Sequence, residues 1–186
     1  MNRPTETEYA PDYQSYVDQV TENDVIAVLR RELDDLDVLL DRVPADKETY
    51  AYAEGKWTIR QLVGHLIDGE RVFGYRALCI ARGEKQNLPG FEQDEYLQTS
   101  PYNHIDLEDL LSEMRLVRLS NIAMFRSLDE AAWNRVGVAN NNEVTVRALA
   151  FIMAGHVRHH MNVLRERYLD GARASTPAEM KSEPPA

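Results

Sequence analysis

The stretch Thr145–Leu169 reads TVRALAFIMAGHVRHHMNVLRERYL and indicates the fold most clearly. Its apolar residues recur every three or four positions, which is the spacing of one face of an α-helix. The members of this stripe are Val146, Leu149, Ala150, Met153, Val157, Met161, Leu164 and Tyr168. Thr145 stands directly before the stripe, where its hydroxyl can cap free backbone amides of the first turn. We therefore expect one long helix from Thr145 to about Leu169.

Three histidines lie within Gly155–His160 (GHVRHH) of this helix. His156 and His160 are four residues apart, so they lie one turn above each other and can direct two imidazoles at one metal ion. At about 100° per residue, both fall on or beside the apolar stripe. His159 falls about 120° away from Met153, so we expect it to face solvent. A site would need a third ligand from elsewhere in the chain.

A second helix is expected from Thr58 to about Arg82 (TIRQLVGHLIDGERVFGYRALCIAR). Thr58 and Gln61 have the spacing of a capping box, in which each side chain satisfies a free backbone amide. His65 falls on the flank of the apolar stripe. Gly69, one turn later, leaves room beside that stripe, although a glycine inside a helix costs roughly 1 kcal/mol relative to alanine.

The two helices begin alike, because Thr58-Ile59-Arg60-x-Leu62 is echoed by Thr145-Val146-Arg147-x-Leu149. Counted from the two threonines, His65 lies at +7, His156 at +11 and His160 at +15. Offsets that differ by four keep nearly the same angular position on a helix. If both apolar stripes face inward, the three imidazoles can border one cavity. The alternative is that each histidine is hydrogen-bonded separately at the edge of the core.

Two further helical patterns complete an all-α, four-helix bundle, from about Asp24 to Val43 and from Asp106 to about residue 128. The connection over residues 83–105 is long enough to cross from one end of a bundle to the other. Residues 129–143 are expected to form a polar connection. We expect a short N-terminal arm over residues 1–20, packed on the bundle through its tyrosines, the bundle itself over residues 21–170, and a disordered tail over residues 171–186.

The formal net charge of −10 and the pI near 5.0 argue against nucleic acid or an anionic membrane as a partner, because both would repel the protein. The single cysteine, Cys79, excludes an intrachain disulfide and is expected to be a small buried apolar residue. No long uncharged apolar run indicates a signal peptide or a membrane span. A cytoplasmic protein is therefore expected.

Several stronger catalytic signatures are absent from the sequence. HVRHH lacks the glutamate of the HExxH motif, and no Glu-x-x-His pair occurs on each of two helices, so neither a zincin protease nor a di-iron bundle is indicated. There is also no glycine-rich phosphate loop and no Cys-x-x-Cys pair.

Three stretches resemble the DinB-like family of small bacterial metal-binding proteins: Trp57–Arg82, Leu88–Phe91 (LPGF) and Ala154–Tyr168. The resemblance covers about residues 20–170. It implies a four-helix bundle, often a homodimer, with its metal on one histidine of the second helix and two of the fourth, which correspond here to His65, His156 and His160. Relatives include transferases and isomerases that use low-molecular-weight thiols.

The sequence thus leaves two functions open. The first is a metal-dependent enzyme in which a divalent ion, Zn or Ni by the preference of imidazole, activates a thiol or a water, making it a transferase or a hydrolase of a small-molecule substrate. Glu70 and Arg76 are weak candidates for catalytic residues, and each could instead form an interhelix ion pair. The second is a non-catalytic metal-binding protein of a stress response, in which His104 or a loop carboxylate would close the coordination.

Overall fold

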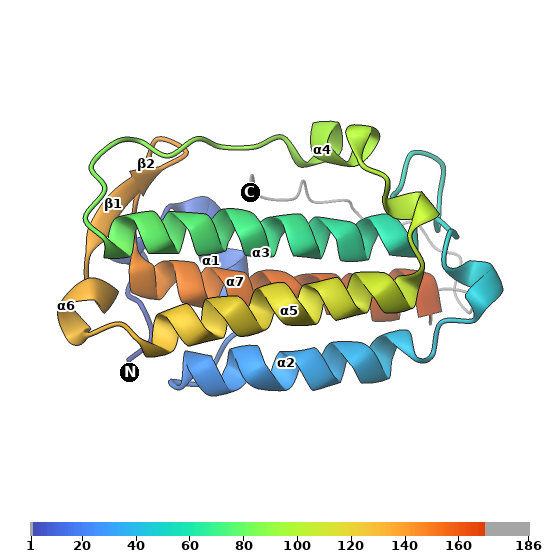
Figure 1. Ribbon diagram of the computed structural model, residues 1–186, viewed down its shortest axis with the longest axis horizontal. Coiled ribbons are helices and arrows are strands. Elements are labelled where there is room, and N and C mark those ends of the chain that lie inside the picture. Colours follow the sequence, from blue (N-terminus) through green and yellow to red (C-terminus); the bar gives the residue numbers. More distant parts are fainter. Residues whose placement is uncertain (1, 170–186) are drawn as a thin grey trace.

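The structure is a computed structural model, and it describes residues 2–169. The tail expected over residues 171–186 lies outside the described residues. Four long helices run along the long axis of the molecule (Figure 1): α2 (Val25–Leu40), α3 (Ile59–Ala81), α5 (Leu107–Arg126) and α7 (Val146–Val163). Extensive contacts join α3 to α5 and α7, and α2 to the same two helices. The helices α2 and α3 therefore lie at opposite corners, and the predicted four-helix bundle is confirmed.

The long connection after α3 is a crossover. It returns along the bundle past α4 (Gln93–Thr99) and a 3-10 turn, η4 (Tyr102–His104), so that α3 and α5 run in the same direction (Figure 1). A shorter connection after α2 contains η3 (Ala45–Lys47). Among the described residues, no helix is both long and apolar enough to span a membrane.

Both predicted caps form. The Gln61 backbone amide donates to the Thr58 hydroxyl over 3.1 Å, and the Thr58 amide donates to the Gln61 side chain over 3.0 Å. The Ala148 amide donates to the Thr145 hydroxyl over 3.0 Å. Beyond Val163, α7 continues as a π-helical segment, η5 (Leu164–Leu169), which reaches the last described residue.

The expectation of a plain polar connection over residues 129–143 is wrong. This segment contains α6 (Glu130–Trp133) and an antiparallel hairpin of β1 (Val136–Ala139) and β2 (Asn142–Thr145). Its turn residues, Asn140 and Asn141, have φ angles of 49° and 63°. Asparagine tolerates this left-handed conformation better than most residues, which suits it to a two-residue hairpin turn.

The N-terminal segment folds against the bundle through η1 (Glu6–Glu8), η2 (Pro11–Tyr13) and α1 (Gln14–Val17). Its tyrosines are buried as expected: the exposed fraction is 6% for Tyr9, 8% for Tyr13 and 3% for Tyr16. A Cβ at Gly155 would collide with the backbone carbonyl of Tyr16, so this glycine permits the close approach of α1 to α7.

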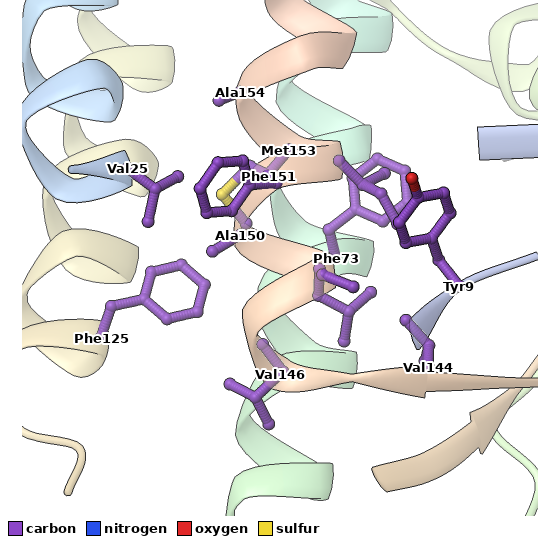
Figure 2. Close-up of a cluster of buried hydrophobic side chains, with 14 of the residues drawn as sticks. Tyr9, Val25, Phe73, Phe125, Val144, Val146, Ala150, Phe151, Met153 and Ala154 are labelled. Atoms are coloured by element: carbon purple, nitrogen blue, oxygen red, sulfur yellow. The ribbon is translucent and has the colours of Figure 1, made fainter. Parts of the chain in front are cut away.

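The helix α7 lies at the centre of the molecule, because α2, α3 and α1 all pack on it. Figure 2 shows part of one buried hydrophobic cluster, in which Phe151 and Met153 of α7 lie among side chains from other elements, such as Val25 and Phe125. Every residue from Ala148 to Val157 is buried. The arm therefore covers the face of α7 that the apolar stripe alone would have left exposed.

Candidate metal centre

Three histidines from two helices meet in the bundle. His65 of α3 and His156 and His160 of α7 are buried, with exposed fractions of 1%, 2% and 1%. Their ring centroids are 4.6 to 4.8 Å apart, and one ring nitrogen from each lies within 4.8 Å of the others. The Nε2 atoms of His65 and His156 are 2.8 Å apart. The folded chain thus brings together the three histidines singled out from the sequence.

The chemistry of this triad fits a metal ion. Both ring nitrogens of His160 are buried, and within residues 2–169 neither has a hydrogen-bond partner. Burial lowers the pKa of His156 and of His160 well below 6.5, and the neighbouring histidines lower both further. The rings are therefore neutral at physiological pH, which is the form of imidazole that binds metals. Buried polar atoms without partners are rare in proteins, so they call for an explanation.

Within the described part of the chain, no fourth histidine, cysteine or carboxylate joins the group of three. His104, which the sequence offered as a closing ligand, is exposed in η4. Three protein ligands are the number that catalytic zinc sites use, since they leave a position for water or substrate.

Aromatic rings surround the triad. Tyr16 of the arm meets His156 edge-on at 5.4 Å between centroids, and Phe73 of α3 meets the same ring at 5.7 Å. The indole of Trp57 lies 4.7 Å from His65 and 6.2 Å from His160. None of these rings was expected at the site from the sequence. The only local signal was that Trp57 directly precedes the capping box of the helix that carries His65.

The expectation that His159 faces solvent is wrong. Its side chain is half-buried, with its ring 5.5 Å from Tyr16 and 5.0 Å from His160. The physical reason is α1, which covers this side of α7. His159 nonetheless does not belong to the group of three.

Glu70 lies in an ion-pair network that joins all four long helices. Its carboxylate accepts from Arg118 of α5 over 2.6 Å and from Asn121 over 3.0 Å. Arg118 also donates to Glu32 of α2 over 3.0 Å, and Glu32 accepts from Arg158 of α7 over 2.8 Å. The interhelix ion pair considered from the sequence for Glu70 is thus present. Burial raises the pKa of Glu32 to about 7, against the opposing effect of the two arginines.

Arg76 forms a different kind of contact from the ion pair that was considered for it. It is buried on α3 and donates to the backbone carbonyl of Pro89 over 2.9 Å. Its guanidinium also lies 5.8 Å from the centroid of Phe73. Cys79, expected to be buried, is half-buried against the core.

The fold and the triad define a helical-bundle protein with a histidine-lined candidate metal centre. Residues 29–164 match the profile of the DinB superfamily, and the chain belongs to that superfamily. A relative from Oceanobacillus iheyensis, named as a candidate metal-dependent hydrolase, is 26% identical over 115 residues, which cover 59% of this chain and 64% of that protein. The match thus spans less than two thirds of the relative.

Solved structures share the fold. YfiT from Bacillus subtilis, described as a probable metal-dependent hydrolase with an unusual four-helix bundle topology, has a TM-score of 0.70 at 16% identity, covering 92% of this chain and 94% of that one. A mycothiol-dependent maleylpyruvate isomerase has a TM-score of 0.63 at 13% identity, covering 78% and 61%. The DinB-like protein YjoA from Bacillus subtilis has a TM-score of 0.56 at 18% identity, covering 84% and 97%.

Proposed function

We propose that this protein is a metal-dependent hydrolase of a small-molecule substrate, in which His65, His156 and His160 hold one divalent ion, Zn or Ni. The observation that carries the proposal is the triad itself. Three buried imidazoles bring ring nitrogens within 4.8 Å of one another, and His160 has no hydrogen-bond partner for either nitrogen within residues 2–169. The name of the Oceanobacillus relative and the description of YfiT support the same reaction class.

A divalent ion bound there would supply Lewis-acid chemistry and lower the pKa of a water placed in its open position. The residues of the chain have three tasks around it. The histidines bind in their neutral form, Tyr16 and Phe73 keep water away from His156, and the network around Arg118 holds the four helices in register. Glu70 remains a candidate catalytic residue only if its carboxylate leaves Arg118 during the reaction.

The first test is metal binding. Elemental analysis of the purified protein should find about one divalent ion per chain, and titration of the metal-free protein with Co²⁺ should give a visible spectrum typical of imidazole ligands. His160→Ala should abolish binding. His159→Ala is the matched control, and it should retain the Co²⁺ spectrum. If His160→Ala binds as tightly as the unchanged protein, the proposal is wrong.

The second test is turnover. Chromogenic esters and amides should be hydrolysed by the metal-loaded protein, and chelation should remove the activity in proportion to the metal lost. If the metal-loaded protein hydrolyses none of them, but chelation lowers its melting temperature strongly, the ion has the structural role of a non-catalytic metal-binding protein.

A thiol-dependent transferase is the second candidate, because the fold is shared with an isomerase that depends on mycothiol. In that case the bound ion would activate a low-molecular-weight thiol in place of water. A screen that combines several thiols with varied electrophiles separates the two candidates, since only the transferase needs the thiol for turnover. A homodimer and a cytoplasmic location also remain predictions, the first of which size-exclusion chromatography with light scattering can test.

A further inference from the structure

Trp57 connects the buried triad to the surface of the protein. The three histidines have exposed fractions of 1% to 2%, so neither an ion nor a substrate reaches them unless a side chain moves. Of the aromatic rings that contact them, Tyr16 and Phe73 are buried, whereas Trp57 and His159 are half-buried. Trp57, which contacts two of the three histidines, is therefore a wall of the site that is partly open to solvent.

The backbone of Trp57 is held firmly. Its carbonyl accepts a hydrogen bond from the Tyr168 hydroxyl of η5 over 2.6 Å, and the next residue, Thr58, is fixed by the capping box. The chain before it contains exposed residues, including Gly55 with a φ of 73°. Movement of the indole therefore needs rotation about side-chain torsions, which takes picoseconds to nanoseconds when the ring is not restrained.

One hydrogen bond restrains this rotation. The indole Nε1 of Trp57 donates to Oδ1 of Asp94 over 3.0 Å. Asp94 is exposed on the short helix α4, which belongs to the crossover connection and not to the bundle. The closed position of the indole thus depends on a contact at the surface that touches no residue of the triad.

We propose that Trp57 is the gate of the histidine site and that Asp94 is its latch, so that ions and small substrates enter between the start of α3 and α4. The inference rests on the proposed function, because it assigns the entrance of the same site. When the latch opens, the indole turns away from His65 and His160 and exposes their ring nitrogens. The size of the opening then limits which substrates enter.

A gate has a kinetic signature that a structural contact lacks. If opening precedes both entry and exit, easier opening speeds both steps by the same factor and leaves the dissociation constant unchanged. Loss of the latch removes a hydrogen bond of modest net strength. We therefore expect Asp94→Ala to raise the association and the release rate constants together by about fivefold.

The experiment follows Co²⁺ by its visible absorption in a stopped-flow instrument, with entry into the metal-free protein and release into excess chelator measured separately. Trp57→Phe, which keeps an aromatic ring but lacks the N–H donor, should speed both rates as Asp94→Ala does. Glu95→Ala is the matched control, because Glu95 is an exposed carboxylate on the same short helix, whereas the indole N–H of Trp57 donates to Asp94. It should leave both rates unchanged.

A second measurement needs no metal. The chain has two tryptophans, so Trp133→Phe leaves Trp57 as the only indole fluorophore. In that background, Asp94→Ala should increase quenching of Trp57 by acrylamide.

The gate is wrong if Asp94→Ala leaves both rates and the quenching unchanged while His160→Ala still abolishes binding, and in that case the metal site stands. The gate is also wrong if Asp94→Ala changes only the association or only the release rate constant. The contact between Asp94 and Trp57 would then stabilise either the metal-free or the metal-bound protein alone. If the unchanged protein binds no Co²⁺ at equilibrium, the proposed function fails first and the gate with it.

Discussion

The imidazole of His156 occupies the space that a side chain at Gly69 would fill. A Cβ added to Gly69 would lie 2.9 Å from Cε1 of His156 and 3.2 Å from Nδ1. The room that the sequence predicts beside Gly69 on α3 is thus taken by a ring from α7. The helices α3 and α7, which are distant in sequence, pack closely here because Gly69 has no side chain and the ring of His156 fills the space.

Gly69→Ala should weaken Co²⁺ binding by at least tenfold, because the new methyl group displaces His156 from the other two rings. Helix propensity alone would favour the alanine by about 1 kcal/mol, so a loss of binding cannot arise from a weaker helix. Isothermal titration calorimetry of the metal-free protein with Co²⁺ measures the change in the dissociation constant. Gly74→Ala is the control for a crowded glycine on the same helix, since its added Cβ would collide with the Asn121 side chain, and no ring of the triad is among the nearest atoms. Equal affinities for Gly69→Ala and the unchanged protein would contradict the prediction.

The stability of the metal-free protein should fall as the pH drops below 6.5. Burial holds the pKa of His156 and of His160 well below that value, whereas both histidines take up protons near pH 6.5 in the unfolded chain. The unfolded state then binds more protons, and each histidine lowers the free energy of unfolding by up to about 1.4 kcal/mol per pH unit. Urea unfolding in the presence of chelator, between pH 7.5 and 5.5, measures the slope.

Two variants separate the contributions to that slope. His160→Leu should remove about half of the histidine effect. Glu32 has the opposite effect on the pH dependence of stability, because its pKa is raised from 4.5 to about 7. The folded state then holds the extra proton, and stability increases as the pH falls through that window. Glu32→Gln should therefore steepen the loss of stability on acidification. If neither substitution changes the dependence of stability on pH, other titratable groups control that dependence.

Arg118→Leu should lower the free energy of unfolding by about 3–5 kcal/mol, because it leaves Glu32 and Glu70 buried without their shared cation. Glu70→Gln keeps the shape and a hydrogen-bonding oxygen, so its cost should be smaller, about 1–3 kcal/mol. Urea denaturation measures both changes. Co²⁺ affinity in Glu70→Gln should remain within about threefold of the unchanged protein, since the Glu70 carboxylate accepts from Arg118 and Asn121 and does not belong to the group of three histidines. If Glu70→Gln retains stability and affinity but loses turnover, Glu70 acts in the reaction itself.

Gly155→Ala should detach the N-terminal arm from α7, because the added Cβ would collide with the carbonyl of Tyr16. We expect faster amide hydrogen exchange over residues 9–20 and easier proteolysis there, while the four long helices remain folded. The ring of Tyr16 lies against His156 and His159, so metal release should also become faster. Unchanged exchange in the arm would show that α1 adapts to the extra methyl group.

The site could be predicted to the extent that it depends on angular position along a helix. His65, His156 and His160 lie on the inner sides of helices whose starts are marked by Thr58 and Thr145, and the cap offsets give the three nearly the same angular position. The network around Arg118 could not be found in this way, since Glu32, Glu70 and Arg158 lie on three different helices. Their pairing depends on which helices become neighbours, and helical periodicity contains no such information.

The sequence by itself determined the four helices, their caps, the long crossover and the three histidines, because these depend on local periodicity and on backbone amides that need partners close by. Only the tertiary structure decided what surrounds the histidines. The arm covers α7 and buries His159 partly, and α4 places Asp94 against Trp57. The hairpin over residues 136–145 also escaped prediction, since its strands are short and gain stability from contact with Leu88 and Ile80. Contacts between distant segments form only when the whole chain has folded, and no local pattern records them.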